Sequence, residues 1–191
     1  MKYINTINSL FGEAYLENAL AYNYSISSRF ELNDGGTYIQ MFLESFERFK
    51  AILNCLYPKK AKFVVATCFY EPKKLVRKLP DGLKKLRQQD FNLPKQYQRL
   101  VSYDADWETY VYVYLFEIDI WSPEFNIIVW NILGGDLGIE PSCEISSYFF
   151  DLENQILIHP YDDRGVDIVA KKKGSLSQIN KKFKKYKMEI N

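Results

Sequence analysis

The residues of this chain that most resemble the components of an active site lie together between positions 159 and 167. The only histidine, three carboxylates and an arginine fall in the segment His159-Pro160-Tyr161-Asp162-Asp163-Arg164-Gly165-Val166-Asp167. Histidine titrates near neutral pH, so His159 beside a carboxylate has the composition for general acid–base catalysis. The three aspartates could also supply oxygen ligands to a magnesium or calcium ion, although their spacing matches no EF-hand loop.

The same segment also has the composition of a β-turn between two apolar runs. A turn would use Gly165 at a positive φ and an aspartate side chain as acceptor for a backbone N–H. Arg164 has carboxylates on both sides, so we expect it to pair with one of them. We therefore favour a structural turn over a catalytic or a binding role for the set Tyr161, Asp162, Asp163, Arg164, Gly165 and Asp167.

Other kinds of catalytic or cofactor site lack their usual residues. Cys55, Cys68 and Cys143 show no C-x-x-C spacing, which indicates buried thiols in a reducing compartment rather than a disulfide framework or a zinc site. Neither a Walker-type phosphate loop nor a G-x-S-x-G nucleophile motif is present. We expect no cofactor, no bound metal and no enzymatic activity.

Charge is divided sharply along the chain although the net charge is only +1. Residues 59–100 and 171–191 are rich in lysine and arginine, whereas residues 101–170 carry 14 acidic residues and a single basic one, Arg164. A block this acidic attracts cations and basic proteins and repels nucleic acid. We interpret the basic stretches as solvated faces, so a nucleic-acid partner is not expected.

The acidic block suggests a recognition surface for a basic protein. Asp104, Asp106 and Glu108 alternate just before an apolar run, so an extended chain would place them on one side and Trp107 on the other. Acidic residues near element ends and exposed tryptophans could complete the surface. The candidate contact residues are Asp104, Asp106, Trp107, Glu108, Asp119, Trp121, Glu124, Asp136 and Glu140. The alternative is that these acids only keep the surface soluble.

Hydrophobic periodicity predicts helices and strands in alternation. Helices are expected over about 2–21, 37–56, 81–88 and 122–133, the last with Ser122 as N-cap and Pro123 in the first turn. Strands are expected over 25–32, 61–70, 98–103, 109–118, 144–151, 155–159 and 165–171. In 109–118 valine and leucine alternate with tyrosine and phenylalanine, so both faces of that strand should be covered.

These elements predict one α+β domain over residues 1–191, with a mixed or largely antiparallel sheet and helices packed on it. A basic excursion over about 71–100 and a basic C-terminal helix over about 175–188 complete it. The N-terminal residues lack the apolar run of a signal peptide, and no apolar run is long enough to cross a membrane. We therefore expect a cytoplasmic protein with no membrane partner.

Three segments of the chain are similar to one bacterial family of unknown biochemical function. They are Ser28-Arg29-Phe30-Glu31-Leu32, Gly138-Ile139-Glu140-Pro141-Ser142, and the stretch from His159 to Ala170 with its YDDRG core. The resemblance spans residues 25–187 and implies an immunity protein, of the kind that protects bacteria performing contact-dependent growth inhibition. Its expected partner is a cognate toxin domain, for which we expect a basic nuclease. The resemblance carries over no catalytic residue.

Two other function classes remain open at this point. One is a metal-dependent or hydrolytic enzyme that uses the YDDRG segment, which requires Asp162, Asp163 and Arg164 to line a pocket beside His159. The other is a regulatory interaction module without a toxin partner. The residues do not determine the toxin, the contact residues among the acids, or whether the chain self-associates.

Overall fold

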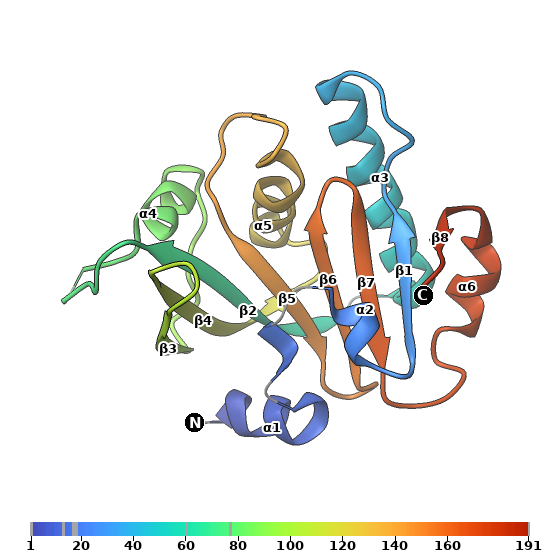
Figure 1. Ribbon diagram of the computed structural model, residues 1–191, viewed down its shortest axis with the longest axis horizontal. Coiled ribbons are helices and arrows are strands. Elements are labelled where there is room, and N and C mark those ends of the chain that lie inside the picture. Colours follow the sequence, from blue (N-terminus) through green and yellow to red (C-terminus); the bar gives the residue numbers. More distant parts are fainter. Residues whose placement is uncertain (1, 13, 17–18, 60, 77, 191) are drawn as a thin grey trace.

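The computed structural model describes residues 2–12, 14–16, 19–59, 61–76 and 78–190. Within these residues eight strands form one sheet in the order β3-β4-β2-β5-β6-β7-β1-β8, and each neighbouring pair is antiparallel. The strands are β1 (Ser27–Glu31), β2 (Lys62–Glu71), β3 (Tyr97–Asp104), β4 (Thr109–Asp119), β5 (Ser146–Asp151), β6 (Ile156–Asp162), β7 (Gly165–Ala170) and β8 (Lys187–Met188). Figure 1 shows the sheet running from β3 at one side of the molecule to β8 at the other. The α+β prediction is confirmed.

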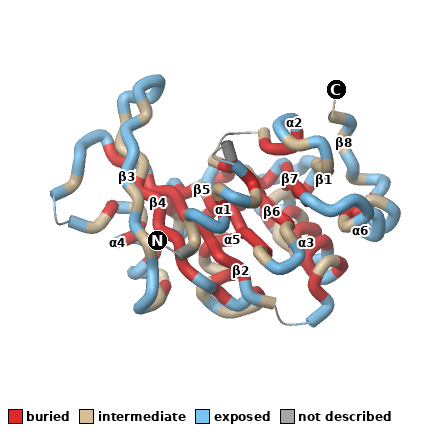
Figure 2. Tube along the Cα trace, turned by 90° about the horizontal axis from the view of Figure 1, so that it is seen from below, coloured by how far each residue is buried: buried red, intermediate tan, exposed pale blue. Residues whose placement is uncertain are grey.

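Helices cover both faces of the sheet. They are α1 (Lys2–Phe11), η1 (Ala14–Leu16), α2 (Leu20–Asn23), α3 (Tyr38–Leu56), α4 (Asp81–Gln88), α5 (Pro123–Gly134), α6 (Ser177–Lys182) and η2 (Lys184–Tyr186). Side chains from α3, α4, α5 and α6 share one core with one face of the sheet, and side chains from α1, η1 and α2 share a second core with the other face. Figure 2 shows the buried residues concentrated along the central strands, with exposed residues around β3 and α6.

Strand alternation divides the sheet residues between these two cores. In β2, Phe63, Val65 and Phe69 face the larger helical layer, while Val64, Ala66 and Cys68 face α1. In β4 the tyrosines and Phe116 face the larger layer, and Val113 and Leu115 face the other. Successive side chains of a strand point to opposite faces, so a strand in the middle of three layers must be apolar on both. The prediction that both faces of the 109–118 strand are covered is confirmed.

Local capping sets the start of the two longest helices. Thr37 accepts a hydrogen bond from the Gln40 backbone N–H (3.3 Å) and its own N–H donates to the Gln40 side chain (3.0 Å), which forms a capping box before α3. Ser122 accepts from the Phe125 N–H (3.1 Å), and Pro123 occupies the first turn of α5. Both helices therefore begin where the sequence predicted.

The two ends of the chain differ from prediction. The expected N-terminal helix is divided into α1, η1 and α2, and residues 13, 17 and 18 of that range lie outside the described part. The expected basic helix over 175–188 ends at Lys182 and is followed by η2 and β8. Phe183 is buried against Phe30 with ring centroids 6.4 Å apart, and Met188 then pairs with Arg29 at the free edge of β1. The hydrogen-bonding groups of that edge capture the last residues as a strand, which overrides their helical propensity.

Candidate functional site

The YDDRG turn leads into β7, which lies beside β1, the strand that contains most of the RFEL segment, although more than 100 residues separate the two segments in sequence. Strand β1 pairs with β7 in a register that sets Arg29 opposite Asp167, Phe30 opposite Val166 and Glu31 opposite Gly165. Two of the three segments that carry the family resemblance therefore make one structural unit, which we call the motif site.

A buried ion pair lies at the centre of the motif site. The Arg29 guanidinium binds both oxygens of Asp167, with Nε–Oδ1 2.6 Å and Nη2–Oδ2 2.7 Å. Asp167 is fully buried and also accepts from the Ala21 backbone N–H at 3.1 Å. The hydrogen bond to Asp167 is the main cause that raises the pKa of Arg29. Two parallel N–H···O bonds to a fully buried carboxylate fix the orientation of the guanidinium plane.

Tyrosine rings hold Arg29 from the sides. The guanidinium carbon lies 5.0 Å from the ring centroid of Tyr22 and 5.0 Å from that of Tyr161. Both distances fall within the range of cation–π attraction. Arg29 is thereby oriented by an acid of β7 and by aromatic rings from α2 and from the YDDRG segment.

The YDDRG segment is a turn between β6 and β7, as predicted. Asp162 Oδ1 accepts from the Arg164 backbone N–H (2.7 Å), and Asp162 Oδ2 accepts from Arg164 Nε (2.8 Å) and Nη2. Asp163 is buried and its Oδ2 accepts from Asn33 Nδ2 at 2.9 Å. Burial is the largest cause that raises the pKa of Asp163, and the neighbouring Asp162 adds to it. Arg164 pairs with a flanking carboxylate, as expected.

Gly165 serves a different purpose from the one predicted. It lies in strand β7, and its φ is not among the positive glycine angles of the chain. A Cβ at this position would lie 2.0 Å from the Tyr161 hydroxyl and 3.0 Å from the Phe30 carbonyl oxygen. Glycine is therefore required by the close approach of Tyr161 and β1, not by turn conformation.

His159 is buried away from the surface of the motif site. It is 1% exposed, stacks on Tyr148 with ring centroids 4.1 Å apart, and its Nδ1 lies 3.1 Å from the Ser147 carbonyl oxygen. Burial lowers the pKa of His159 to about 4. The imidazole is therefore neutral at physiological pH and is placed as a core residue on the α1 side of the sheet.

A cavity of about 660 Å³ opens beside the motif site. Its lining comprises Ala19, Arg29, Glu31, Asn33, Tyr161, Asp162, Arg164 and Met188. His159 and Asp163 do not line it, although an enzyme using this segment would require them there. The carboxylates of Asp162, Asp163 and Asp167 each bind a different donor side chain. Across the described parts of the chain, no three His, Cys, Asp or Glu side chains are placed together to hold a metal ion.

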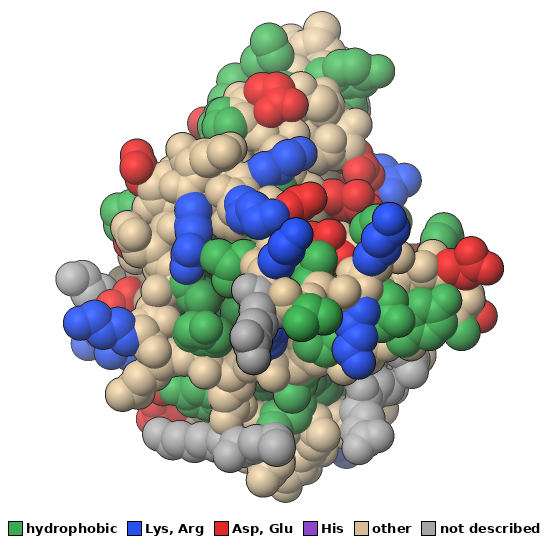
Figure 3. Space-filling view, turned by 90° about the vertical axis from the view of Figure 1, so that its left-hand side faces the viewer, with side chains coloured by type: hydrophobic (Ala, Val, Ile, Leu, Met, Phe, Trp, Pro, Cys, Tyr) green, Lys and Arg blue, Asp and Glu red, His purple; other side chains and the backbone are tan. Residues whose placement is uncertain are grey.

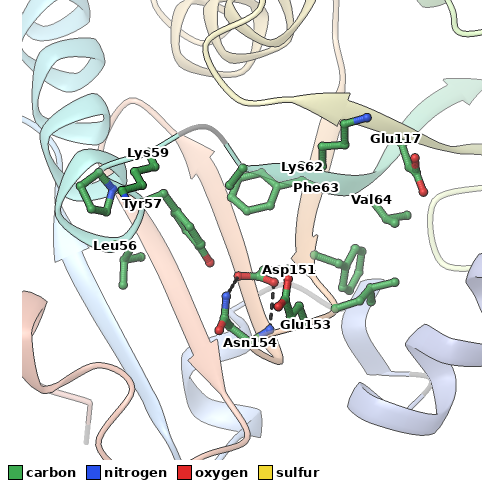
Figure 4. A pocket seen from close by; sticks show the side chains of 14 residues that line it. Leu56, Tyr57, Lys59, Lys62, Phe63, Val64, Glu117, Asp151, Glu153 and Asn154 are labelled. Carbon is green, nitrogen blue, oxygen red and sulfur yellow. Dashed lines mark hydrogen bonds between the residues drawn. The ribbon is translucent and has the colours of Figure 1, made fainter.

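A second cavity, of about 610 Å³, was not anticipated from the sequence. It lies between the end of α3, the start of β2 and the turn from β5 to β6, and Figure 4 shows Tyr57 pointing toward Asp151 within it. Asp151 is buried and accepts from the Asn154 N–H (2.9 Å) and side-chain amide (2.6 Å), which closes the turn after β5. The Asp-x-x-Asn spacing is a sequence signal for that turn, but it does not indicate the cavity beside it.

The acidic candidates fall in three separate places. Asp104, Asp106, Trp107 and Glu108 form the tip of the β3–β4 hairpin, whereas Asp119, Trp121 and Glu124 lie at the far end of β4 and the start of α5. Ten residues of strand, about 33 Å at the usual rise, separate these two groups. Asp136 lies near Arg164 and raises the pKa of that residue, although less than Asp162 does. Glu140 accepts from the Ser142 N–H (2.8 Å) in the loop after α5.

The alternating arrangement predicted for Asp104, Asp106 and Glu108 is wrong. Residues 105–108 form a turn, in which Asp104 Oδ1 accepts from the N–H groups of Asp106 (3.1 Å) and Trp107 (3.2 Å). Glu108 has a φ of 48°, in the left-handed region. An aspartate that binds the backbone two residues on is a turn-forming device, and this local bond competes successfully with extension of the strand.

Strand β3 is an outer strand of the sheet and pairs only with β4 among the described residues. Its residues Tyr97, Val101 and Tyr103 are exposed and lie at alternate positions on one face. Trp107 at the tip of the hairpin is 79% exposed. Figure 3 views this end of the molecule and shows basic and acidic side chains side by side among apolar ones, so this end is not uniformly acidic.

The fold is an antiparallel α+β domain in which β1, the RFEL strand, pairs with β7, the strand that follows the YDDRG turn. Residues 4–191 match the family described as Domain of unknown function (DUF3885), and the chain belongs to that family. No curated protein and no solved structure matches the chain. The expected membership of a family of unknown function is confirmed. No helix of the described residues is both long and apolar enough to cross a membrane.

Proposed function

We propose that this protein is an immunity protein that binds and neutralises a cognate bacterial toxin domain in the cytoplasm. The β3–β4 hairpin is the contact surface, and a basic nuclease is the expected toxin. The observation that carries the proposal is the hairpin itself, an open sheet edge that ends in an exposed tryptophan between acidic residues.

The open edge of β3 supports binding to a protein. An outer strand presents backbone N–H and C=O groups that a strand of another chain can pair with, and proteins usually cover or break such an edge. Here the edge strand runs eight residues from Tyr97 to Asp104. The alternate side chains Tyr97, Val101 and Tyr103 would flank an added strand and give it specificity.

The tip of the hairpin supports a basic partner. Trp107 is the kind of large amphipathic residue that anchors protein interfaces. Asp106 and Glu108 are exposed on either side of it. Carboxylates beside an aromatic anchor favour lysine and arginine in the partner, speed association at low salt and suppress binding of acidic proteins.

The test is binding to the toxin domain encoded by the adjacent gene. The purified toxin domain is titrated into this protein by calorimetry at about 50 mM and about 300 mM salt, a range over which surface charge is increasingly screened. We expect tight, salt-sensitive binding, and protection of cells that express the toxin. Absence of binding at low salt contradicts the proposal.

Paired variants locate the contact. Asp106→Asn with Glu108→Gln should weaken binding and reduce its dependence on salt, whereas Glu153→Gln, an exposed acid on the β5–β6 turn, should leave both unchanged. If the hairpin variants bind the toxin domain as well as the parent does, the hairpin is not the contact surface. If a different protein binds and the toxin domain does not, the regulatory interaction module is the correct class.

The enzyme alternative has one observation in its favour, the cavity of about 660 Å³ at the motif site. Arg29 is bonded to Asp167 and Arg164 to Asp162, and His159 is not among the residues that line the cavity. The geometry therefore supports it less well than protein binding. An Asp162→Asn variant separates the two functions. If it folds and still protects cells from the toxin, Asp162 is not needed for protection and the enzyme alternative is contradicted.

A further inference from the structure

A groove with an apolar floor lies between α3 and α5, on a different surface from the β3–β4 hairpin. A depression of about 370 Å³ is lined by Phe46 of α3, Ile127 and Trp130 of α5, Pro141, Gln89, Asp90 and Asn126. The two helices run antiparallel, since Phe42 contacts Trp130 (ring centroids 4.5 Å) while Lys50 Nζ lies 5.8 Å from the ring centroid of Trp121.

The first turns of α3 extend the apolar surface of this groove. Ile39 and Leu43 are 64% and 55% exposed and precede Phe46 by seven and three residues. Positions i, i+4 and i+7 lie on one face of a helix, so these three side chains form a continuous stripe. Figure 1 shows the N-terminal part of α3 projecting beyond the rest of the helical layer. Large apolar residues grouped in this way on a surface mark a site of interaction.

One acidic side chain lines the groove, and three more are close in sequence to residues that line it. Glu47 follows Phe46 on α3, Asp90 lines the groove itself, Glu124 lies one turn before Ile127, and Glu140 precedes Pro141. The basic residue on this stripe, Lys50, directs its ammonium group over the rings of Phe46 (5.4 Å) and Trp121 (5.8 Å). The groove thus combines an apolar floor with a rim in which negative charge exceeds positive.

We infer that the α3–α5 groove binds one amphipathic α-helix of a partner protein, whose apolar stripe is flanked by lysine or arginine. The spacing of Ile39, Leu43 and Phe46 matches the ridges that one helix offers to another. The acidic rim selects for basic flanks on that helix. A second copy of this chain fits less well, because α3 would bring the same acidic residues against themselves.

This inference goes beyond the proposed function, because the groove and the hairpin are separate surfaces that can be tested separately. The probe is a synthetic helical peptide of about 18 residues, long enough for five turns, with leucine at i, i+3, i+4 and i+7 and lysine elsewhere. Two peptides serve as controls, one with glutamate in place of lysine and one with the lysine peptide's residues in scrambled order.

Binding can be read from tryptophan fluorescence with little interference. The chain has three tryptophans: Trp130 lines the groove, and Trp121 lies beside Lys50, whose ammonium group also contacts the groove residue Phe46. Replacing the third, Trp107→Phe, leaves a protein whose tryptophan fluorescence comes only from Trp121 and Trp130. We expect the lysine peptide to shift this fluorescence and to bind at least about tenfold more tightly than either control peptide at about 50 mM salt.

Variants of the groove distinguish specific docking from general attraction between opposite charges. Leu43→Asn should lower the affinity for the lysine peptide by at least about tenfold. The position is exposed, and circular dichroism checks that the variant still folds. Glu47→Gln with Asp90→Asn should weaken it and reduce the effect of salt, while Val76→Gln, an exposed apolar residue remote from the groove, should change nothing.

Three results would overturn the inference. The first is equal affinity for the lysine and glutamate peptides, and the second is binding that Leu43→Asn does not affect. The third is a parent protein that sediments as a dimer and a Leu43→Asn variant that sediments as a monomer, which would make a second copy the occupant. Failure of the toxin-binding test alone leaves all of these measurements unchanged.

Discussion

The motif site and the β3–β4 hairpin contain similar charged and aromatic side chains in opposite surroundings. In the motif site Arg29, Asp167 and Asp162 each bind a partner within the chain, and the rings of Tyr22 and Tyr161 flank the arginine. In the hairpin, Asp104 holds the turn, whereas Trp107 and its acidic neighbours extend into solvent.

This difference separates residues that build the fold from residues available to a partner. A charge without water must be paired and hydrogen-bonded, so the residues that look most chemical in this sequence are the ones committed to structure. An exposed tryptophan at the tip of a hairpin gains little from the fold itself. Substitutions in the motif site should therefore mainly lower stability, whereas substitutions in the hairpin should mainly weaken binding.

The largest expected effect on stability is at the buried ion pair. Arg29→Met keeps most of the side-chain volume but leaves Asp167 charged and buried without its counter-ion, which should lower the free energy of unfolding by about 3–5 kcal/mol. The control is Lys84→Met, which breaks a salt bridge with Asp81 that is exposed on both sides and should change the free energy of unfolding far less. Urea unfolding of both variants measures the contrast, and equal losses would contradict it.

The buried His159 should make stability depend on pH. Its pKa is lowered from 6.5 to about 4 in the folded protein, so the unfolded chain takes up a proton more readily. Stability should fall as the pH drops from about 6.5 to about 4, by about 3 kcal/mol in total, and this component should not change further below that range. At neutral pH the imidazole of His159 is largely uncharged in both the folded and the unfolded chain, so its titration does not lower the free energy of unfolding.

A variant isolates this contribution from other acid-titrating groups. The raised pKa of Asp163 has the opposite effect in acid, because the folded state binds that proton more readily than the unfolded chain. His159→Gln removes the imidazole and leaves Asp163 in place. Unfolding free energies of the parent and the variant, measured from pH 7 to pH 4, should converge as the pH falls, and parallel curves would show that His159 does not titrate as described.

Gly165 provides a smaller test of how closely the motif site is packed. Gly165→Ala should cost about 1–3 kcal/mol, because the new methyl group would overlap the Tyr161 hydroxyl. Adding Tyr161→Ala should make the double variant more stable than the sum of the single losses predicts. Strict additivity in urea unfolding would mean that Tyr161 is not what requires glycine at this position.

The smallest effect on stability and the largest on binding are expected at the hairpin. Trp107→Ala should change the free energy of unfolding by less than about 0.5 kcal/mol, because the side chain is almost wholly in solvent. The same variant should lower the affinity for the proposed toxin domain by at least about tenfold. A stability loss comparable to that of Arg29→Met would remove the distinction between the two regions.

Elements with local signals were predictable from the sequence. Helix α4 spans Asp81–Gln88 as expected, and α3 and α5 begin after Thr37 and Ser122, where side chains satisfy free backbone N–H groups. The two-sided apolar pattern of β4 also identified a strand covered on both faces. Each of these features depends on residues that lie within one or two turns of each other.

Features that depend on distant residues were not predictable. The contact of Arg29 with Asp167 follows from the β1–β7 register, and the last residues become β8 only because β1 leaves an edge open. Alternation alone suggested that Asp104, Asp106 and Glu108 face one way, but Asp104 closes a turn instead. The α3–α5 groove was not predictable, because the exposure of Ile39 and Leu43 depends on which other segments pack against α3.

The sequence by itself determined the α+β class, most element positions, the YDDRG turn and the uneven distribution of charge, because each rests on local propensity or composition. Only the tertiary structure decided which charges are buried in pairs and which are exposed, since burial depends on contacts between segments far apart in the chain. It also divided the acidic residues among three places. The contact surface that we propose is the β3–β4 hairpin, and the α3–α5 groove is the second surface that we propose.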